Sequence, residues 1–121
     1  MKWTKGISAT ASVLTLVSGL AFAQTKGDAN AGKTKYDALC VGCHGATGKG
    51  DGAAAAALNP KPGDFTSCKE MGKLSDDVLH KAIKEGGKAI NKSPLMPPWG
   101  ASVNDQQTRD LVSYIRSFCK K

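Results

Sequence analysis

The sequence predicts a single small all-α domain whose helices are joined by long, ordered loops. Strand signals are almost absent, because no run of Val, Ile and aromatic residues alternates over five or more positions. Apolar residues recur instead at helical spacing in several segments. Residues 24–121 number 98, which is enough for one domain. They show no internal repeat or linker.

Residues 1–23 have the three parts of a secretory signal peptide. MKWTK is a short basic start, GISATASVLTLVSGL is mostly apolar, and Ala21 and Ala23 are the small residues that a signal peptidase reads. An uncleaved anchor helix is the alternative, but Ser, Thr and Gly dilute the stretch, which barely reaches spanning length. We therefore predict cleavage after Ala23, export to the periplasm, a mature domain over 24–121 and no stable membrane insertion.

The charge of the chain argues against a nucleic-acid-binding protein. The formal net charge is +7, and it falls to +5 when Lys2 and Lys5 leave with the signal peptide. Lys and Arg are spread along the chain, without a basic block interleaved with aromatic residues. A monomer whose basic face steers it toward acidic protein partners fits this distribution better.

The first two helical patterns lie in the N-terminal half of the mature chain. DANAGKTKYDALC, over 28–40, begins with a capping residue, Asp28, and places Tyr36 and Leu39 on one face. AAAAAL, over 53–58, is a short helix-prone stretch that NPKPGD stops.

Two amphipathic helices follow in the C-terminal half. DDVLHKAIKE, over 76–85, follows the N-cap type Ser75 and ends at a Gly-Gly pair. The last helix is capped by Asn104 or Asp105 and runs through QQTRDLVSYIRSFCKK. The residues predicted to face the core are Val78, Leu79, Ala82 and Ile83 in the first helix, and Leu111, Val112, Ile115 and Phe118 in the second.

The segment between these helices, KAINKSPLMPPWGASV, is predicted to be a loop. A loop of this length in a compact domain is usually functional or disordered. Its three prolines and Trp99 favour rigid placement over disorder.

Aromatic residues are few for a domain of this size. The mature chain has only Tyr36, Phe65, Trp99, Tyr114 and Phe118. Small domains with so thin a core usually depend on a disulfide, a metal or a cofactor. The composition therefore indicates that a large apolar group is bound.

The stretch LCVGCHGATGKGDG contains Cys40, Cys43 and His44 in a Cys-x-x-Cys-His arrangement. Such a motif can be a redox disulfide, half of a zinc site or a covalent haem anchor. A structural zinc ion needs four ligands, usually from two paired knuckles, and the other cysteines, Cys68 and Cys119, lie far apart in the sequence. A thioredoxin-like disulfide needs a βαβ context, and the chain has no strand pattern.

Haem attachment accounts for all three residues of the motif together. Two thiols on one helical turn can each add to one of two neighbouring vinyl groups. The residue that follows then lies under the ring, with its imidazole directed at the iron. One covalently bound haem c would also supply the apolar bulk that the composition lacks.

At these residues the chain resembles the class I monohaem cytochrome c family of the bacterial periplasmic type. The family places its CxxCH motif after a first helix and a Met-bearing loop, here PLMPPWG, before its last helix. The resemblance implies a fold of three to five helices around one covalent haem. It also implies a contact between the first and last helices, with Gly32 and Tyr36 against Leu111 and Tyr114.

The resemblance also implies the residues around the iron. In similar proteins a proline carbonyl orients the proximal histidine, and here Pro60 and Pro62 both compete for that role. Met96 matches the distal ligand of the family, and Trp99 offers an apolar surface to cover the ring edge. Met71 and His80 are better interpreted as a core residue and a solvated helix position.

Ligation by His44 and Met96 implies a one-electron carrier rather than an enzyme, since both faces of the iron are then occupied. Lys49, Lys88 and Lys92 lie in or near segments expected to flank the haem edge, where they are either docking residues for acidic redox proteins or ordinary solvated lysines. Two alternatives are a haem-based sensor with a labile distal site and a cytochrome subunit of a larger oxidoreductase.

Cys68 and Cys119 do not belong to the haem anchor. Two cysteines left over in a small exported domain usually pair with each other. We therefore predict a disulfide between them, although it is not a usual feature of the family.

Overall fold

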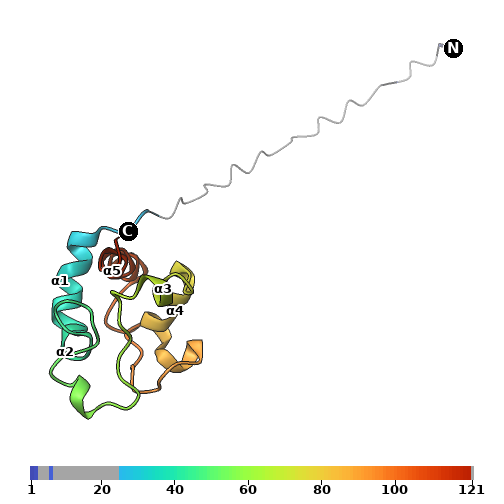
Figure 1. Ribbon diagram of the computed structural model, residues 1–121. Helices are drawn as coiled ribbons and strands as arrows, with labels where there is room; N and C mark the ends of the chain where they lie inside the picture. Colours follow the sequence, from blue (N-terminus) through green and yellow to red (C-terminus); the bar gives the residue numbers. More distant parts are fainter. Residues whose placement is uncertain (3–5, 7–24, 121) are drawn as a thin grey trace.

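The structure, a computed structural model, describes residues 1, 2, 6 and 25–120 (Figure 1). The predicted signal peptide and its cleavage site fall almost wholly outside these residues. The described residues form helices and loops without a strand, which confirms the all-α fold class. The helices are α1 (Ala29–Leu39), α2 (Val41–His44), α3 (Cys68–Met71), α4 (Asp76–Glu85) and α5 (Asp105–Ser117), with the 3-10 helices η1 (Ala55–Ala57) and η2 (Gly87–Ile90). None of the described helices is long and apolar enough to cross a membrane.

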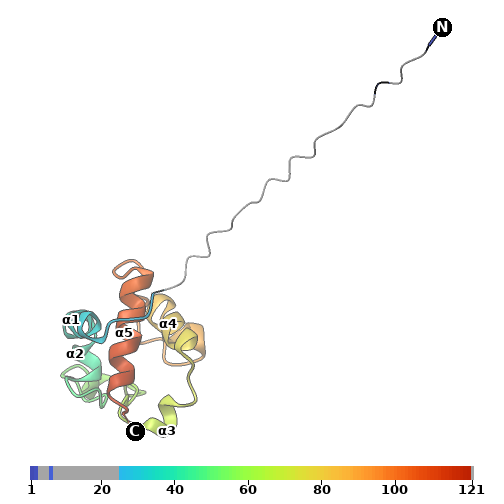
Figure 2. The ribbon, with the colours of Figure 1, turned by 90° about the horizontal axis from the view of Figure 1, so that it is seen from above.

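Helix α5 is the centre of the fold, because both α1 and α4 pack against it. In the view from above it lies between them (Figure 2). Gly32 makes the close approach of α1 possible, since a Cβ at this position would overlap the carbonyl group of Asp110 and lie 2.9 Å from Cβ of Tyr114. The rings of Tyr36 and Tyr114 meet edge to face with centroids 5.1 Å apart. The contact expected between the first and last helices is therefore present.

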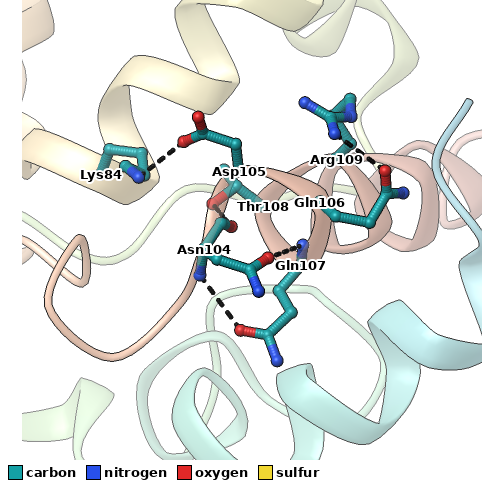
Figure 3. A network of polar contacts seen from close by, with 7 residues as sticks. All are labelled: Lys84, Asn104, Asp105, Gln106, Gln107, Thr108 and Arg109. Carbon is teal, nitrogen blue, oxygen red and sulfur yellow. Dashed lines mark hydrogen bonds and ion pairs between the residues drawn. The ribbon is translucent and has the colours of Figure 1, made fainter. Parts of the chain in front are cut away.

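The three longer helices begin at the capping residues that the sequence predicts. The carboxylate of Asp28 accepts hydrogen bonds from two N–H groups of α1, and the Ser75 hydroxyl accepts one from Val78 N–H. Asn104, rather than Asp105, caps α5 and forms a reciprocal capping box with Gln107 (Figure 3). Asp105 instead pairs with Lys84 at 2.7 Å, which ties the start of α5 to α4 (Figure 3).

The core is a single cluster contributed mainly by α1, α4 and α5. Its buried members are Tyr36, Met71, Leu79, Ile83, Val103, Leu111, Val112 and Ile115. Of the residues predicted to face inward, Val78 and Phe118 are only partly buried. The interpretation of Met71 as a core residue is confirmed, with 4% of its surface exposed.

Three segments differ from the sequence prediction in length or type. The stretch 53–58 forms only the 3-10 turn η1, because Gly52 and Pro60 leave too few residues between them for an α-helix. The segment after Phe65 contains the short helix α3, and the long loop before α5 begins with η2. Helix α5 ends at Ser117, and its last bonds, such as Phe118 N–H to Ile115 C=O at 3.2 Å, have the shorter i to i+3 spacing.

Candidate haem site

The Cys-x-x-Cys-His motif folds into one helical turn, α2, which follows α1 almost directly. Cys40 is its N-cap, and its carbonyl accepts hydrogen bonds from Cys43 N–H at 3.2 Å and His44 N–H at 2.9 Å. This turn places the two cysteines three positions apart, on the same side of a helix. Before haem is attached, burial raises the pKa of the Cys40 thiol to about 11.

The turn ends at Gly45, which has a positive φ of 78° that glycine adopts without strain. The chain then folds back, and Gly50 N–H donates to the His44 carbonyl at 2.8 Å. From α1, the Tyr36 hydroxyl donates to the carbonyl of Gly45 at 2.7 Å. The backbone on both sides of His44 is therefore fixed by hydrogen bonds.

The carbonyl that lies against His44 belongs to Gly63, whose oxygen is 3.3 Å from Nδ1. The expectation that Pro60 or Pro62 supplies this carbonyl is not met by the structure. The carbonyl of Pro62 packs instead against Gly50, where a Cβ would overlap it, and the next carbonyl along the chain, that of Gly63, faces the imidazole.

Engagement of Nδ1 by a carbonyl leaves Nε2 of His44 as the nitrogen that can bind iron. Burial also lowers the pKa of His44, which favours the neutral imidazole required of a metal ligand.

Met96 is held near the end of α4 by the loop that precedes α5. Its carbonyl accepts a hydrogen bond from Gly87 N–H at 3.0 Å, and Trp99 N–H donates to the carbonyl of Ile83 at 2.8 Å. Gly86, with a positive φ of 88°, lets the backbone of Met96 and Pro98 approach closely. The loop is therefore attached to α4 at several points, as expected from its prolines and Trp99.

One almost wholly apolar cavity brings together four of the predicted site residues, Cys40, His44, Met96 and Trp99. It is lined by Leu39, Cys40, His44, Phe65, Ile83, Met96, Trp99, Leu111 and Ile115. A thiol, an imidazole and a thioether thus face a space enclosed otherwise by hydrocarbon and aromatic surface. These groups fit a covalently attached haem. The Cys40 thiol can form a thioether bond to the haem, His44 and Met96 offer nitrogen and sulfur donors for iron, and the rest of the wall is apolar.

Several candidates from the sequence do not line this cavity. Cys43, in the α2 turn, and Pro60 and Pro62, in the segment before Gly63, are not among its lining residues. His80 lines a separate groove with Asp77 and Arg109.

Phe65 is the site residue that the sequence analysis missed. It counts among the few aromatics of the chain, but no motif marked it as a neighbour of the histidine. Its ring stacks on the imidazole of His44 with centroids 4.4 Å apart and planes inclined by 16°.

The structure joins Cys68, at the start of α3, to Cys119, just beyond α5, with Cα atoms 5.2 Å apart. Arg116 reinforces the same connection, because its guanidinium donates to the Met71 carbonyl and to Asp76, each at 2.8 Å. Whether the disulfide forms in the protein stays a prediction, tested below.

An apolar cavity between a Cys-x-x-Cys-His turn and a methionine-bearing loop, in an all-α domain, defines a c-type haem protein. The sequence profile of the cytochrome c family matches residues 29–118. The chain belongs to this family, and its cofactor is a covalently bound c-type haem.

Individual relatives are also c-type cytochromes. Cytochrome c-554(547) of Halothiobacillus neapolitanus is 36% identical over 96 residues, which cover 76% of this chain and 98% of that protein. The solved structure of the KustC0563 c-type cytochrome has a TM-score of 0.61 at 25% identity and covers 74% of this chain and 98% of its own.

A second solved structure comes from the reducing HAO-like protein complex Kustc0457/Kustc0458 of Kuenenia stuttgartiensis. It has a TM-score of 0.63 at 27% identity over 78% of this chain. The match spans only 44% of that longer chain.

Proposed function

We propose that the protein is a one-electron carrier whose haem iron is bound by His44 and Met96. The observation that carries this proposal is the shared cavity, because His44 from α2 and Met96 from the loop after α4 both line it. A cytochrome with both axial positions filled by protein side chains has no open position for a substrate.

When bound, the haem supplies an iron atom that cycles between two oxidation states differing by one electron. The chain anchors this group through Cys40 and Cys43 and holds His44 in a fixed tautomer through Gly63. The backbone bonds of Met96 and Trp99 to Gly87 and Ile83 fix the distal loop. Ligands that are already in place need little rearrangement when the electron arrives or leaves, which favours fast exchange.

The setting of this function is the periplasm, reached through the signal peptide at 1–23, with the mature domain beginning at Gln24. Partners are redox proteins with acidic docking surfaces, met by the exposed lysines Lys49, Lys88 and Lys92. A monomeric carrier is the form that we propose. A second candidate is a cytochrome subunit of a larger oxidoreductase, supported by the likeness to a chain of the HAO-like complex.

Carbon monoxide binding to the ferrous holoprotein tests the carrier function against a sensor with a labile distal site. The wild type should bind carbon monoxide poorly at neutral pH and show the weak sulfur-to-iron band in the red when oxidised. Met96→Leu should abolish that band, lower the reduction potential and admit carbon monoxide readily. Met71→Leu is the matched control and should behave as the wild type, because Met71 lies in the core cluster and not on the cavity.

Rapid uptake of carbon monoxide by the unmutated ferrous protein would favour the sensor. Size-exclusion chromatography of the native protein from its cells distinguishes a free carrier from a subunit of a larger complex. A free carrier elutes at the mass of one domain, whereas a subunit elutes with its complex.

A further inference from the structure

The ring of Phe65 stacks directly on the ring of His44. The two rings are nearly parallel, 16° apart, with centroids 4.4 Å from each other. The segment that carries Phe65 also carries Gly63, whose carbonyl lies 3.3 Å from Nδ1 of the same imidazole. We propose that Phe65 is a positioning residue that sets the plane of the His44 ring and so holds Nδ1 against the carbonyl of Gly63.

The backbone around Phe65 is fixed on both sides. Phe65 N–H donates to the carbonyl of Gly48 at 2.7 Å, which ties the segment to the loop that follows the haem motif. The carboxylate of Asp64 accepts from Thr66 N–H at 2.8 Å and from the Thr66 hydroxyl at 2.6 Å. These bonds close a tight turn about Phe65, so the position of its Cα is set independently of its ring.

The ring of Phe65 is also packed against other aromatic rings. Phe118 stacks on it with centroids 6.3 Å apart and planes 23° apart, and Tyr36 meets it edge-on at 6.5 Å. Phe118 is itself packed against Gly48, where a Cβ would come within 2.8 Å of its ring. The ring of Phe65 therefore has more than one aromatic neighbour, and the loss of one of them should leave it stacked on the imidazole.

A flat ring restricts its neighbour in a way that an aliphatic side chain of similar size does not. Rotation of His44 about its Cβ–Cγ bond would tilt the imidazole out of the stack and lengthen its bond to Gly63. Parallel rings favour the stacked arrangement beyond the area they bury. Leucine at position 65 would fill much of the space and lose this preference.

The inference rests on the proposed ligation of iron by His44, and three variants of the holoprotein test it. Phe65→Leu removes the flat ring, and Phe65→Tyr keeps it. Phe118→Leu is the matched control, because it makes the same substitution in the same aromatic cluster one ring further from His44. Two spectroscopic readouts report on the imidazole itself. They are the exchange rate of the His44 Nδ1 proton with water in the ferrous protein, and the spread of the four haem methyl shifts in the ferric protein, which depends on the orientation of the axial ligands.

Phe65→Leu should speed exchange of the Nδ1 proton about tenfold and change the methyl spread, whereas Phe65→Tyr should restore wild-type values of both. Phe118→Leu should leave both readouts close to the wild type even where it lowers the melting temperature as much as Phe65→Leu does. Equal effects of Phe65→Leu and Phe118→Leu on both readouts would overturn the positioning role of Phe65. The proposed ligation of iron by His44 would still stand. If the His44 ring protons of the wild type lack the large upfield shift of a haem ligand, the ligation and this inference both fail.

Discussion

The hydroxyl of Tyr36 donates a 2.7 Å hydrogen bond to the carbonyl of Gly45, the residue that follows the proposed iron ligand His44. Tyr36 is fully buried, and Gly45 is buried as well. The bond links the middle of α1 to the end of the haem-binding turn. The bond therefore couples the position of α1 to that of the residue beside the ligand.

Tyr36→Phe should lower the free energy of unfolding by about 1 kcal/mol, because it removes one hydrogen bond from a buried carbonyl. The loss stays small because Gly45 C=O also accepts from Gly48 N–H at 3.2 Å. Denaturant unfolding of the holoprotein measures the change. Tyr114→Phe is the control, since the Tyr114 hydroxyl has no hydrogen-bond partner among residues 25–120, and it should be close to neutral.

The buried hydroxyl of Tyr36 should also make the stability of the protein depend on alkaline pH. Burial raises the pKa of Tyr36 well above its ordinary value of 10, so the unfolded chain releases this proton first. Stability should therefore fall as the pH rises above 10, and part of that fall should be absent in Tyr36→Phe. Melting temperatures at pH 9 and pH 11 measure it, and equal slopes for the two proteins would contradict the prediction.

Gly32→Ala should separate α1 from α5. The added methyl group would overlap the carbonyl of Asp110 and press on Tyr114, and such overpacking costs about 1–3 kcal/mol. Thermal unfolding should show the loss. Gly42→Ala is the matched control, because nothing lies within 4 Å of the new Cβ and alanine favours a helical turn. A similar loss in both variants would show that the close helix contact is not the cause.

The haem should be covalent and present once per chain. Acid-acetone extraction followed by a pyridine haemochrome assay should leave one c-type haem per chain in the protein pellet. Haem in the solvent, or a ratio near two, would contradict this. Cys40→Ala with Cys43→Ala should give a chain without retained haem that fails to fold, because the apolar wall of the cavity then faces no partner.

Loss of the predicted disulfide should destabilise the protein without loss of haem. Closing a loop of 51 residues between Cys68 and Cys119 contributes about 4 kcal/mol in the chain-entropy model. Cys68→Ser with Cys119→Ser should therefore unfold at a lower denaturant concentration than the wild type and retain one haem. Non-reducing peptide mapping should recover the linked pair from the wild type, whereas two thiols that alkylate without a reductant would refute the bond.

The sequence was sufficient to predict the elements whose signals are local. Caps at Asp28, at Ser75 and at Asn104 or Asp105, and the apolar stripes of α4 and α5, depend on residues within a few positions of each other. The structure selects Asn104 from the last pair. The same holds for the haem motif, because its three residues occupy one turn.

Features that depend on contacts between distant segments could not be predicted in the same way. The carbonyl of Gly63 lies against His44 while that of Pro62 packs on Gly50, an arrangement that the spacing of the prolines does not encode. The stacking of Phe65 on His44 likewise joins segments 21 residues apart. The short helices α3 and η2 have too few residues for a periodic pattern, and tertiary packing determines them.

The packing of α1 on α5 has a consequence for the order of events during biogenesis. The two helices are adjacent in space, but residues 40–104 separate them along the chain. Contacts between such distant segments form slowly, because the chain loses the entropy of closing a long loop before the contacts add stability. The haem-binding turn follows α1 directly and has left the ribosome long before α5 exists. The turn that carries Cys40 and Cys43 depends on local contacts, so it can form before α5 packs over the cavity.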